Sequence, residues 1–122
     1  MSIRLVVAIS LLLCTNVLES REIKHRIVLK PNQAETVKRG SIRSPDDVVD
    51  YVFEASAGQH IFIYLQPDRR LVSQALLVAP SGKQVGPGTT FDSIFEESGV
   101  FQIRILPHER TAGTFRLRLS MR

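Results

Sequence analysis

The chain of 122 residues is poor in the residues that most site chemistry requires, with one cysteine, three histidines and no tryptophan. The cysteine, Cys14, lies in an apolar N-terminal stretch that we expect to be removed. The mature chain would then hold no disulfide and no thiolate, either as a nucleophile or as a metal ligand. His25, His60 and His108 are scattered, and no His-x-x-x-His spacing occurs, so a zinc site has no support.

The motifs of common catalytic and nucleotide-binding sites are missing as well. No Gly-x-Ser-x-Gly elbow occurs, and Ser81-Gly82 and Ser98-Gly99 fit turns better than nucleophiles. Gly86-Pro87-Gly88 is followed by neither a Lys-Ser pair nor a helical pattern, so it does not match a phosphate-binding loop. We therefore expect a protein that is not an enzyme and that needs no cofactor.

An apolar stretch near the N-terminus, residues 5–14, is too short to cross a membrane. A helix of this length rises about 15 Å, roughly half the thickness of a bilayer core. The stretch follows the positive charge of Arg4, as in a secretory signal peptide. We predict a signal peptide over residues 1–20, cleaved after Ser20, and a mature chain that is periplasmic or secreted and not membrane-spanning. The alternatives are an uncleaved N-terminal anchor or a strand of the core.

The net charge is +4, and it stays at +4 without residues 1–20 because Arg4 and Glu19 leave together. A modest positive charge favours anionic partners and raises encounter rates more than it determines specificity. The alternative is a surface that serves solubility alone.

The mature chain, residues 21–122, has the pattern of one all-β domain. Turn residues recur about every 8–15 residues, and no window keeps a helical period. This pattern predicts an antiparallel sandwich or barrel of about eight strands. The expected strands are residues 26–30, 34–42, 48–55, 60–66, 73–79, 89–95, 100–106 and 114–121, and Gly86-Pro87-Gly88 is expected to break the chain.

The two expected strands 48–55 and 60–66 flank a short break at Ala57-Gly58-Gln59, which predicts a β-hairpin. Both strands are rich in aromatic and β-branched residues, which favour sheets. Alternation places Tyr51 and Phe53 in the core with the apolar residues at positions 61, 63 and 65.

Four stretches together resemble the bacterial pre-peptidase C-terminal domain, in the order expected for that family. They are Phe-x-Ala-x-Ala-Gly-Gln at 53–59, a strand ending in Pro-Ser-Gly at 76–82, the Gly-aromatic strand at 98–105, and Gly-x-Phe-x-Leu at 113–117. The resemblance covers about residues 36–120 and implies a jelly-roll-like β-sandwich, a fold that often forms non-catalytic appendages of secreted proteases. More distantly, the chain is similar to bacterial inhibitors of g-type lysozyme, which are small, exported and built on the same kind of sandwich.

Arginines gather on the polar side of the last two expected strands. Arg116, Arg118 and Arg122 lie opposite the apolar residues of the last strand, and Arg104 has the same position in the strand before it. If these strands pair or lie close, the four arginines form a basic stripe whose guanidinium forks suit carboxylate and phosphate groups. The alternative is a polar face that guards against edge pairing.

Asp46, Asp47 and Asp50 form the best acidic cluster and a weak calcium candidate, because calcium is bound by several carboxylate oxygens from one turn. The alternative is a solvated turn at the start of a strand. Their spacing is not that of an EF-hand loop.

The sequence as a whole predicts an exported, non-catalytic binding or accessory module. Its partner would be a protein or an anionic envelope polysaccharide, bound through the arginines or through loops at one end. Nucleic acid is not expected, because the protein is exported and few aromatics lie among the arginines. The alternative function is inhibition of a g-type lysozyme-like wall hydrolase by loops inserted into its cleft.

Overall fold

A computed structural model describes residues 22–29, 35–44, 46–68, 73–107 and 112–122. The predicted signal peptide over residues 1–20 and His108 lie outside these ranges. Within them, no helix is long and apolar enough to cross a membrane.

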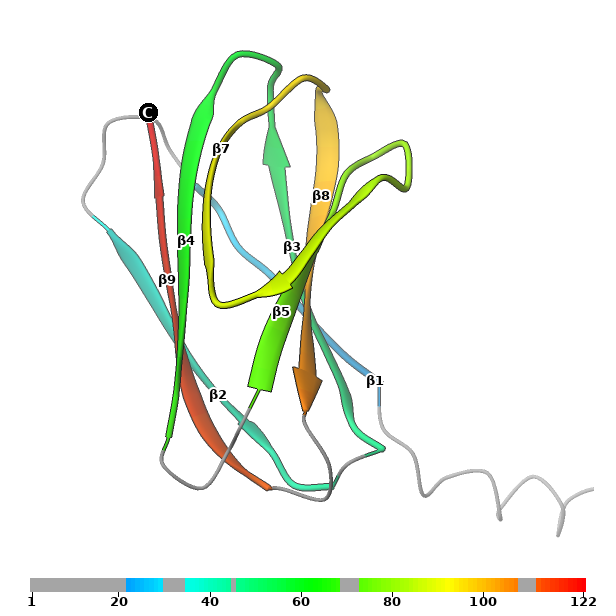
Figure 1. Cartoon of the computed structure of the whole chain (residues 1–122), viewed down its shortest axis with the longest axis vertical. Coiled ribbons are helices and arrows are strands. Elements are labelled where there is room, and N and C mark those ends of the chain that lie inside the picture. Colours follow the sequence, from blue (N-terminus) through cyan, green and yellow to red (C-terminus); the bar gives the residue numbers. More distant parts are fainter. Residues whose placement is uncertain (1–21, 30–34, 45, 69–72, 108–111) are drawn as a thin grey trace, which may run out of the picture.

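The described residues form nine strands in two sheets that pack face to face (Figure 1). The strands are β1 (Glu22–Arg26), β2 (Thr36–Ile42), β3 (Val48–Ala55), β4 (His60–Pro67), β5 (Ser73–Val78), β6 (Gln84–Gly88), β7 (Thr90–Ile94), β8 (Gly99–Pro107) and β9 (Gly113–Met121). Sheet A has the order β1-β3-β8-β5-β6, and sheet B has the order β2-β9-β4-β7. Every connection except β5–β6 therefore passes from one sheet to the other, which is the interleaving of a jelly roll.

The predicted all-β sandwich is confirmed, and so is the assignment of its core faces. Alternation turns every second side chain of each strand toward the opposite sheet, where it is shielded from water. Tyr51 and Phe53 are buried with Ile61, Ile63 and Leu65. The apolar face of β9 is also buried, and comprises Phe115, Leu117, Leu119 and Met121. Each such side chain contributes about 1.5–3 kcal/mol by leaving water.

The hairpin predicted at Ala57-Gly58-Gln59 is wrong. β3 belongs to sheet A and β4 to sheet B, so this turn is an arch that joins the sheets. Gly58 has a φ of 88°, which suits glycine, and its N–H donates to the carbonyl of Phe95 at 2.8 Å. The arch is thus tied to the end of β7 rather than closing a β3–β4 ladder. The end of a strand expected at Pro80-Ser81-Gly82 is confirmed, and this segment is the turn of a hairpin, because β5 pairs with β6.

The first strand begins earlier than predicted. The expected strand 26–30 is replaced by β1 at Glu22–Arg26, which pairs in parallel with β3 at the edge of sheet A. Four of its five side chains are exposed, so hydrogen bonding to β3, rather than burial, holds this polar segment. Gly86-Pro87-Gly88, expected as a break, belongs to β6 at the opposite edge of the same sheet. An edge strand tolerates proline because its missing N–H faces solvent.

Candidate functional site

The four arginines predicted as one stripe are divided between the two sheets. β8, which carries Arg104, lies in sheet A, whereas β9 lies in sheet B. The condition for the stripe, that these two strands lie side by side, is therefore wrong. Arg104 instead faces its register partner Asp50 on β3.

Asp50 and Arg104 form a two-pronged ion pair on the outer side of sheet A. Arg104 Nε donates to Asp50 Oδ1 at 2.9 Å, and Nη2 donates to Oδ2 at 3.1 Å. The Asp50 side chain is fully buried, while that of Arg104 is 41% exposed. The hydrogen bond to Asp50 raises the pKa of the Arg104 guanidinium. This ion pair joins two strands of the sandwich. The guanidinium group of Arg104 therefore binds a carboxylate within the protein and is not free for one of a partner.

Two carboxylates of the acidic cluster, those of Asp47 and Asp50, are likewise engaged in structural contacts. Asp47 Oδ2 accepts the N–H groups of Arg43 at 3.1 Å and Ser44 at 3.3 Å, as expected of a turn. The N–H of Asp46 donates to Ser44 Oγ at 3.3 Å, and Asp50 is held by Arg104. Within the described ranges, no three His, Cys, Asp or Glu side chains are placed to hold a metal ion, so we propose no calcium site.

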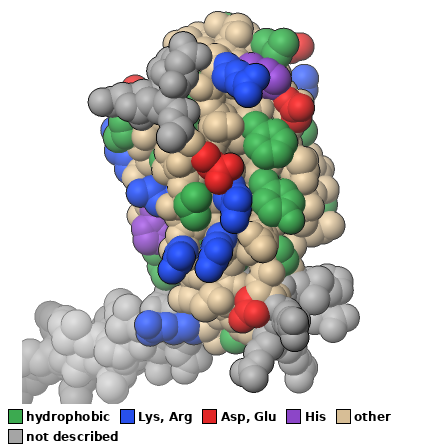
Figure 2. Space-filling view, turned by 90° about the vertical axis from the view of Figure 1, so that its left-hand side faces the viewer, with side chains coloured by type: hydrophobic (Ala, Val, Ile, Leu, Met, Phe, Trp, Pro, Cys, Tyr) green, Lys and Arg blue, Asp and Glu red, His purple; other side chains and the backbone are tan. Residues whose placement is uncertain are grey.

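Arg116 and Arg118 lie on the outer face of sheet B, beside exposed aromatic side chains. Antiparallel pairing sets Arg118 opposite Tyr64 on one side, and Arg116 opposite Arg39 on the other. Phe62 and Tyr64 are 39% and 38% exposed, although both stand in a strand whose other side fills the core. We call Arg39, Phe62, Tyr64, Arg116 and Arg118 the aromatic–arginine face. Figure 2 shows this side, where basic side chains gather next to large hydrophobic ones.

The charges of the aromatic–arginine face are incompletely neutralised by the described part of the chain. Arg118 Nη1 lies 3.5 Å from Glu35 Oε1, but its buried Nε has no hydrogen-bond partner. Arg39 and Arg116 are direct cross-strand neighbours, and neither forms an ion pair with a described carboxylate. Like charges directly opposite one another destabilise a sheet, so stability alone does not favour this pair.

A shallow hollow of about 380 Å³ adjoins the two opposed arginines. Arg39 and Arg116 line it together with Gln66, Asp68 and Thr114. Polar donors and acceptors therefore extend the face beyond the two guanidinium groups at this end of the sheet.

Arg122 stands apart from the other arginines of β9. Four residues of strand place it about 13 Å from Arg118, where its backbone pairs with that of His60 at 2.8 and 2.9 Å. His60 Nε2 contacts Asp92 Oδ1, and the neighbouring Ile94 is 67% exposed. Arg122 thus lies on the same sheet but at the far end from Arg116.

Phe62, Tyr64 and Arg39 are not among the binding residues predicted from the sequence. The phase of β4 could have identified the two aromatic residues. Its buried positions 61, 63 and 65 alternate with outward positions, and these hold Phe62 and Tyr64. Aromatic residues at the outward positions of a strand expose apolar surface, and such surface marks contact sites when it is contiguous.

No family model matches the chain, and no curated protein matches it in sequence. Solved structures do match. The periplasmic inhibitor of g-type lysozyme from Aeromonas hydrophila is 13% identical, with a TM-score of 0.65 over 83% of this chain and 99% of that one. Its counterpart from Salmonella Typhimurium is 14% identical, with a TM-score of 0.65 over 82% and 98%.

The pre-peptidase C-terminal domain of Bacillus anthracis collagenase matches as well. It is 19% identical, with a TM-score of 0.59 over 83% of this chain and 96% of that one. The chain shares the fold of both groups. Both resemblances noted in the sequence are thereby confirmed at the level of the fold, and identities this low establish nothing finer.

Proposed function

We propose that the protein is a non-catalytic binding module, periplasmic or secreted, whose aromatic–arginine face recognises an anionic partner. The observation that carries the proposal is the opposed pair Arg39 and Arg116, which forms no ion pair with a described carboxylate. The pair lies next along β9 to Arg118, which is opposite the exposed Tyr64. Guanidinium forks bind carboxylate and phosphate groups, and Tyr and Arg are enriched where binding energy concentrates. The partner is a protein or an anionic envelope polysaccharide.

The fold is consistent with a role in binding. One group of structural neighbours is named as periplasmic inhibitors and the other as a C-terminal domain of a collagenase, and neither name assigns a reaction to the sandwich itself. The periplasmic location of these inhibitors also supports a periplasmic site of action for this chain.

Reversing the charges of Arg116 and Arg118 tests the proposed surface. The double variant Arg116→Glu, Arg118→Glu should bind an immobilised uronic acid polysaccharide, or an acidic periplasmic protein captured by the wild type, at least about tenfold more weakly. Binding by the wild type should also fall as salt is raised, because exposed charges are screened. Affinity is measured by surface plasmon resonance at two ionic strengths.

A matched double reversal, Lys24→Glu with Lys83→Glu, changes the net charge equally but alters exposed residues away from sheet B. It should retain binding. Equal losses in the two double variants would reduce the effect to net charge, and full binding by the Arg116, Arg118 variant would reject the aromatic–arginine face.

Inhibition of a g-type lysozyme is the second candidate function. It is favoured by the match over 98–99% of the length of the solved inhibitors. The protein should then abolish the lysis of a peptidoglycan suspension by a g-type lysozyme at a 1:1 ratio. Undiminished lysis with excess protein would exclude this candidate and leave the polysaccharide and other protein partners.

A further inference from the structure

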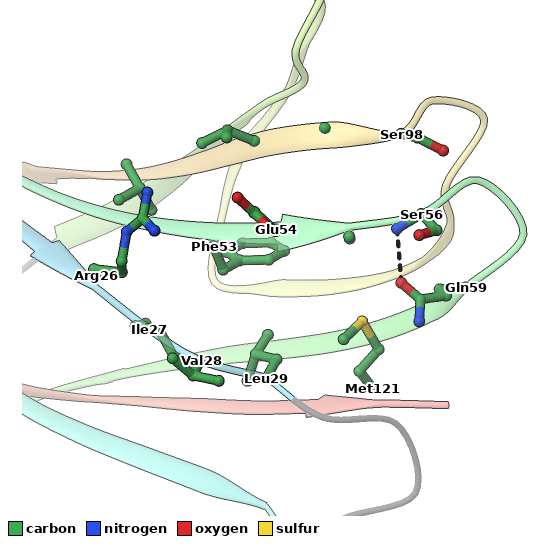
Figure 3. A pocket seen from close by; sticks show the side chains of 14 residues that line it. Arg26, Ile27, Val28, Leu29, Phe53, Glu54, Ser56, Gln59, Ser98 and Met121 are labelled. Carbon is green, nitrogen blue, oxygen red and sulfur yellow. Dashed lines mark hydrogen bonds between the residues drawn. The ribbon is translucent and has the colours of Figure 1, made fainter.

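The edge of β3 is only partly covered by β1. The two strands pair as far as Arg26 opposite Val52, and the N–H of Ile27 then donates to the carbonyl of Val52 at 2.8 Å. Beyond this bond the segment 27–29 leaves β3, which continues to Ala55. Figure 3 shows that the segment 27–29 and β3 diverge. Ile27, Val28 and Leu29 run toward β9, while Phe53 and Glu54 remain in sheet A.

Glu54 consequently has an unpaired backbone edge. Backbone groups two residues apart point to the same side of a strand, and Val52 uses its carbonyl on the β1 side. Glu54 therefore turns both its N–H and its C=O to that side, where the described chain supplies no partner. The next amide on this side, that of Ser56, is already covered by Gln59 Oε1 at 2.7 Å.

An open groove of about 520 Å³ lies along this edge, within the range of ligand sites. Phe53 and Met121, both buried, belong to its lining. Val28 and Val100 also line it and are 71% and 47% exposed, so the groove offers apolar surface that is open to a partner. The groove thus combines an apolar surface with the unpaired backbone N–H and C=O of Glu54.

We propose that this groove binds an extended peptide segment by strand addition to β3. The peptide would accept a hydrogen bond from the Glu54 N–H, donate one to the Glu54 C=O, and place an apolar side chain against Val28 and Val100. A peptide is the occupant that fits, because its backbone repeats donor and acceptor at the spacing of a strand edge. Arg26 and Glu54, both in the lining, add charges of opposite sign.

Two outer sheet edges are less suited to the same role. β2 carries Lys38 and Arg39, and β6 carries Pro87, which are residues that discourage pairing with another strand. The groove shares no residue with the aromatic–arginine face, so the inference holds or fails independently of the function proposed above.

Amide hydrogen exchange read by NMR tests the premise and the binding together. In the free protein, the Glu54 amide should exchange at least about 100-fold faster than those of Phe53 and Ala55, which face β8. A blocked hexapeptide of alternating Thr and Val, added at millimolar concentration, should slow exchange at Glu54 at least about tenfold. A slow Glu54 amide in the free protein, or protection that arises at β2 or β7 instead, overturns the proposal.

Two further probes separate strand addition from non-specific apolar contact. One probe is the hexapeptide N-methylated at every Thr, and the other is the hexapeptide N-methylated at every Val. The two probes lose their N–H donors on opposite edges of the strand. Only one edge pairs with β3, so one probe should bind and the other should not. Equal behaviour of the two probes overturns the proposal. Val28→Asp or Val100→Asp should weaken the binding of the unmethylated probe at least about tenfold. Val85→Asp, at a 41% exposed position on β6, should not, and equal effects at all three sites contradict the groove.

Discussion

Replacing Arg104 with leucine should lower the free energy of unfolding by about 3 kcal/mol. The substitution removes the two donors that reach Asp50 and leaves a fully buried carboxylate without a counter-charge. Breaking a buried ion pair is strongly destabilising because the remaining charge has lost its hydration and gains nothing in return. The loss of about 3 kcal/mol is at the low end of the range for broken buried ion pairs, because the Arg104 side chain is 41% exposed.

Urea denaturation of the single variants and of the double variant Asp50→Val, Arg104→Leu measures this contribution. The double variant should recover most of the stability, since a buried ion pair and a well-packed apolar pair are often nearly equivalent. Arg116→Leu, at an exposed position of β9 without an ion pair to a described residue, should change stability by less than about 0.5 kcal/mol. A loss below about 1 kcal/mol for Arg104→Leu would show that the pair is unimportant for the fold.

Much of the fold follows from alternation along the chain. The inward positions of β3, β4, β8 and β9 are apolar and the outward positions are mostly polar, so the core faces and the fold class are evident from the sequence. The resemblance added the jelly-roll arrangement, which the interleaved strands confirm.

Alternation along the chain does not determine which strands pair. The phase of a strand determines which side chains face inward, but it is the same whether the next strand lies beside it or across the core. Ala57-Gly58-Gln59 therefore has the sequence pattern of a hairpin although it is an arch. For the same reason, the sequence does not show that Arg104 is separated from Arg116. The partner of Arg104 is Asp50, which is 54 positions away in the sequence.

The candidate surface was predictable in part. Arg116 and Arg118 are outward in the clearest alternating strand, so their exposure on one face is confirmed. Phe62 and Tyr64 were not proposed, because aromatic residues in a strand are expected in the core unless their phase is followed through. Arg39 depends on the pairing of β2 with β9, which no local pattern specifies.

Gly40 marks a close approach between the two sheets, and its replacement by valine should be as damaging as the loss of Arg104. A Cβ at this position would lie 2.5 Å from Phe115 Cζ and 2.6 Å from the Tyr51 hydroxyl. Both rings are buried, and Tyr51 is further held by His25, with ring centroids 5.0 Å apart. Burial also raises the pKa of Tyr51 to about 12, because the charged phenolate would be poorly hydrated in this contact.

Because neither ring can move into solvent without opening the core, Gly40→Val should cost about 3 kcal/mol, the upper part of the range for overpacking. Gly88→Val is the matched control: it lies at the end of edge strand β6, with no neighbouring atom within 4 Å of an added Cβ, and should change stability by less than about 1 kcal/mol. Adding Phe115→Leu to Gly40→Val should restore part of the loss, since a smaller side chain makes room for the valine. Thermal and urea unfolding of the three variants and the wild type measure these differences. Equal effects of the two glycine substitutions would mean that strand flexibility, and not the contact with Phe115 and Tyr51, explains the glycine at position 40.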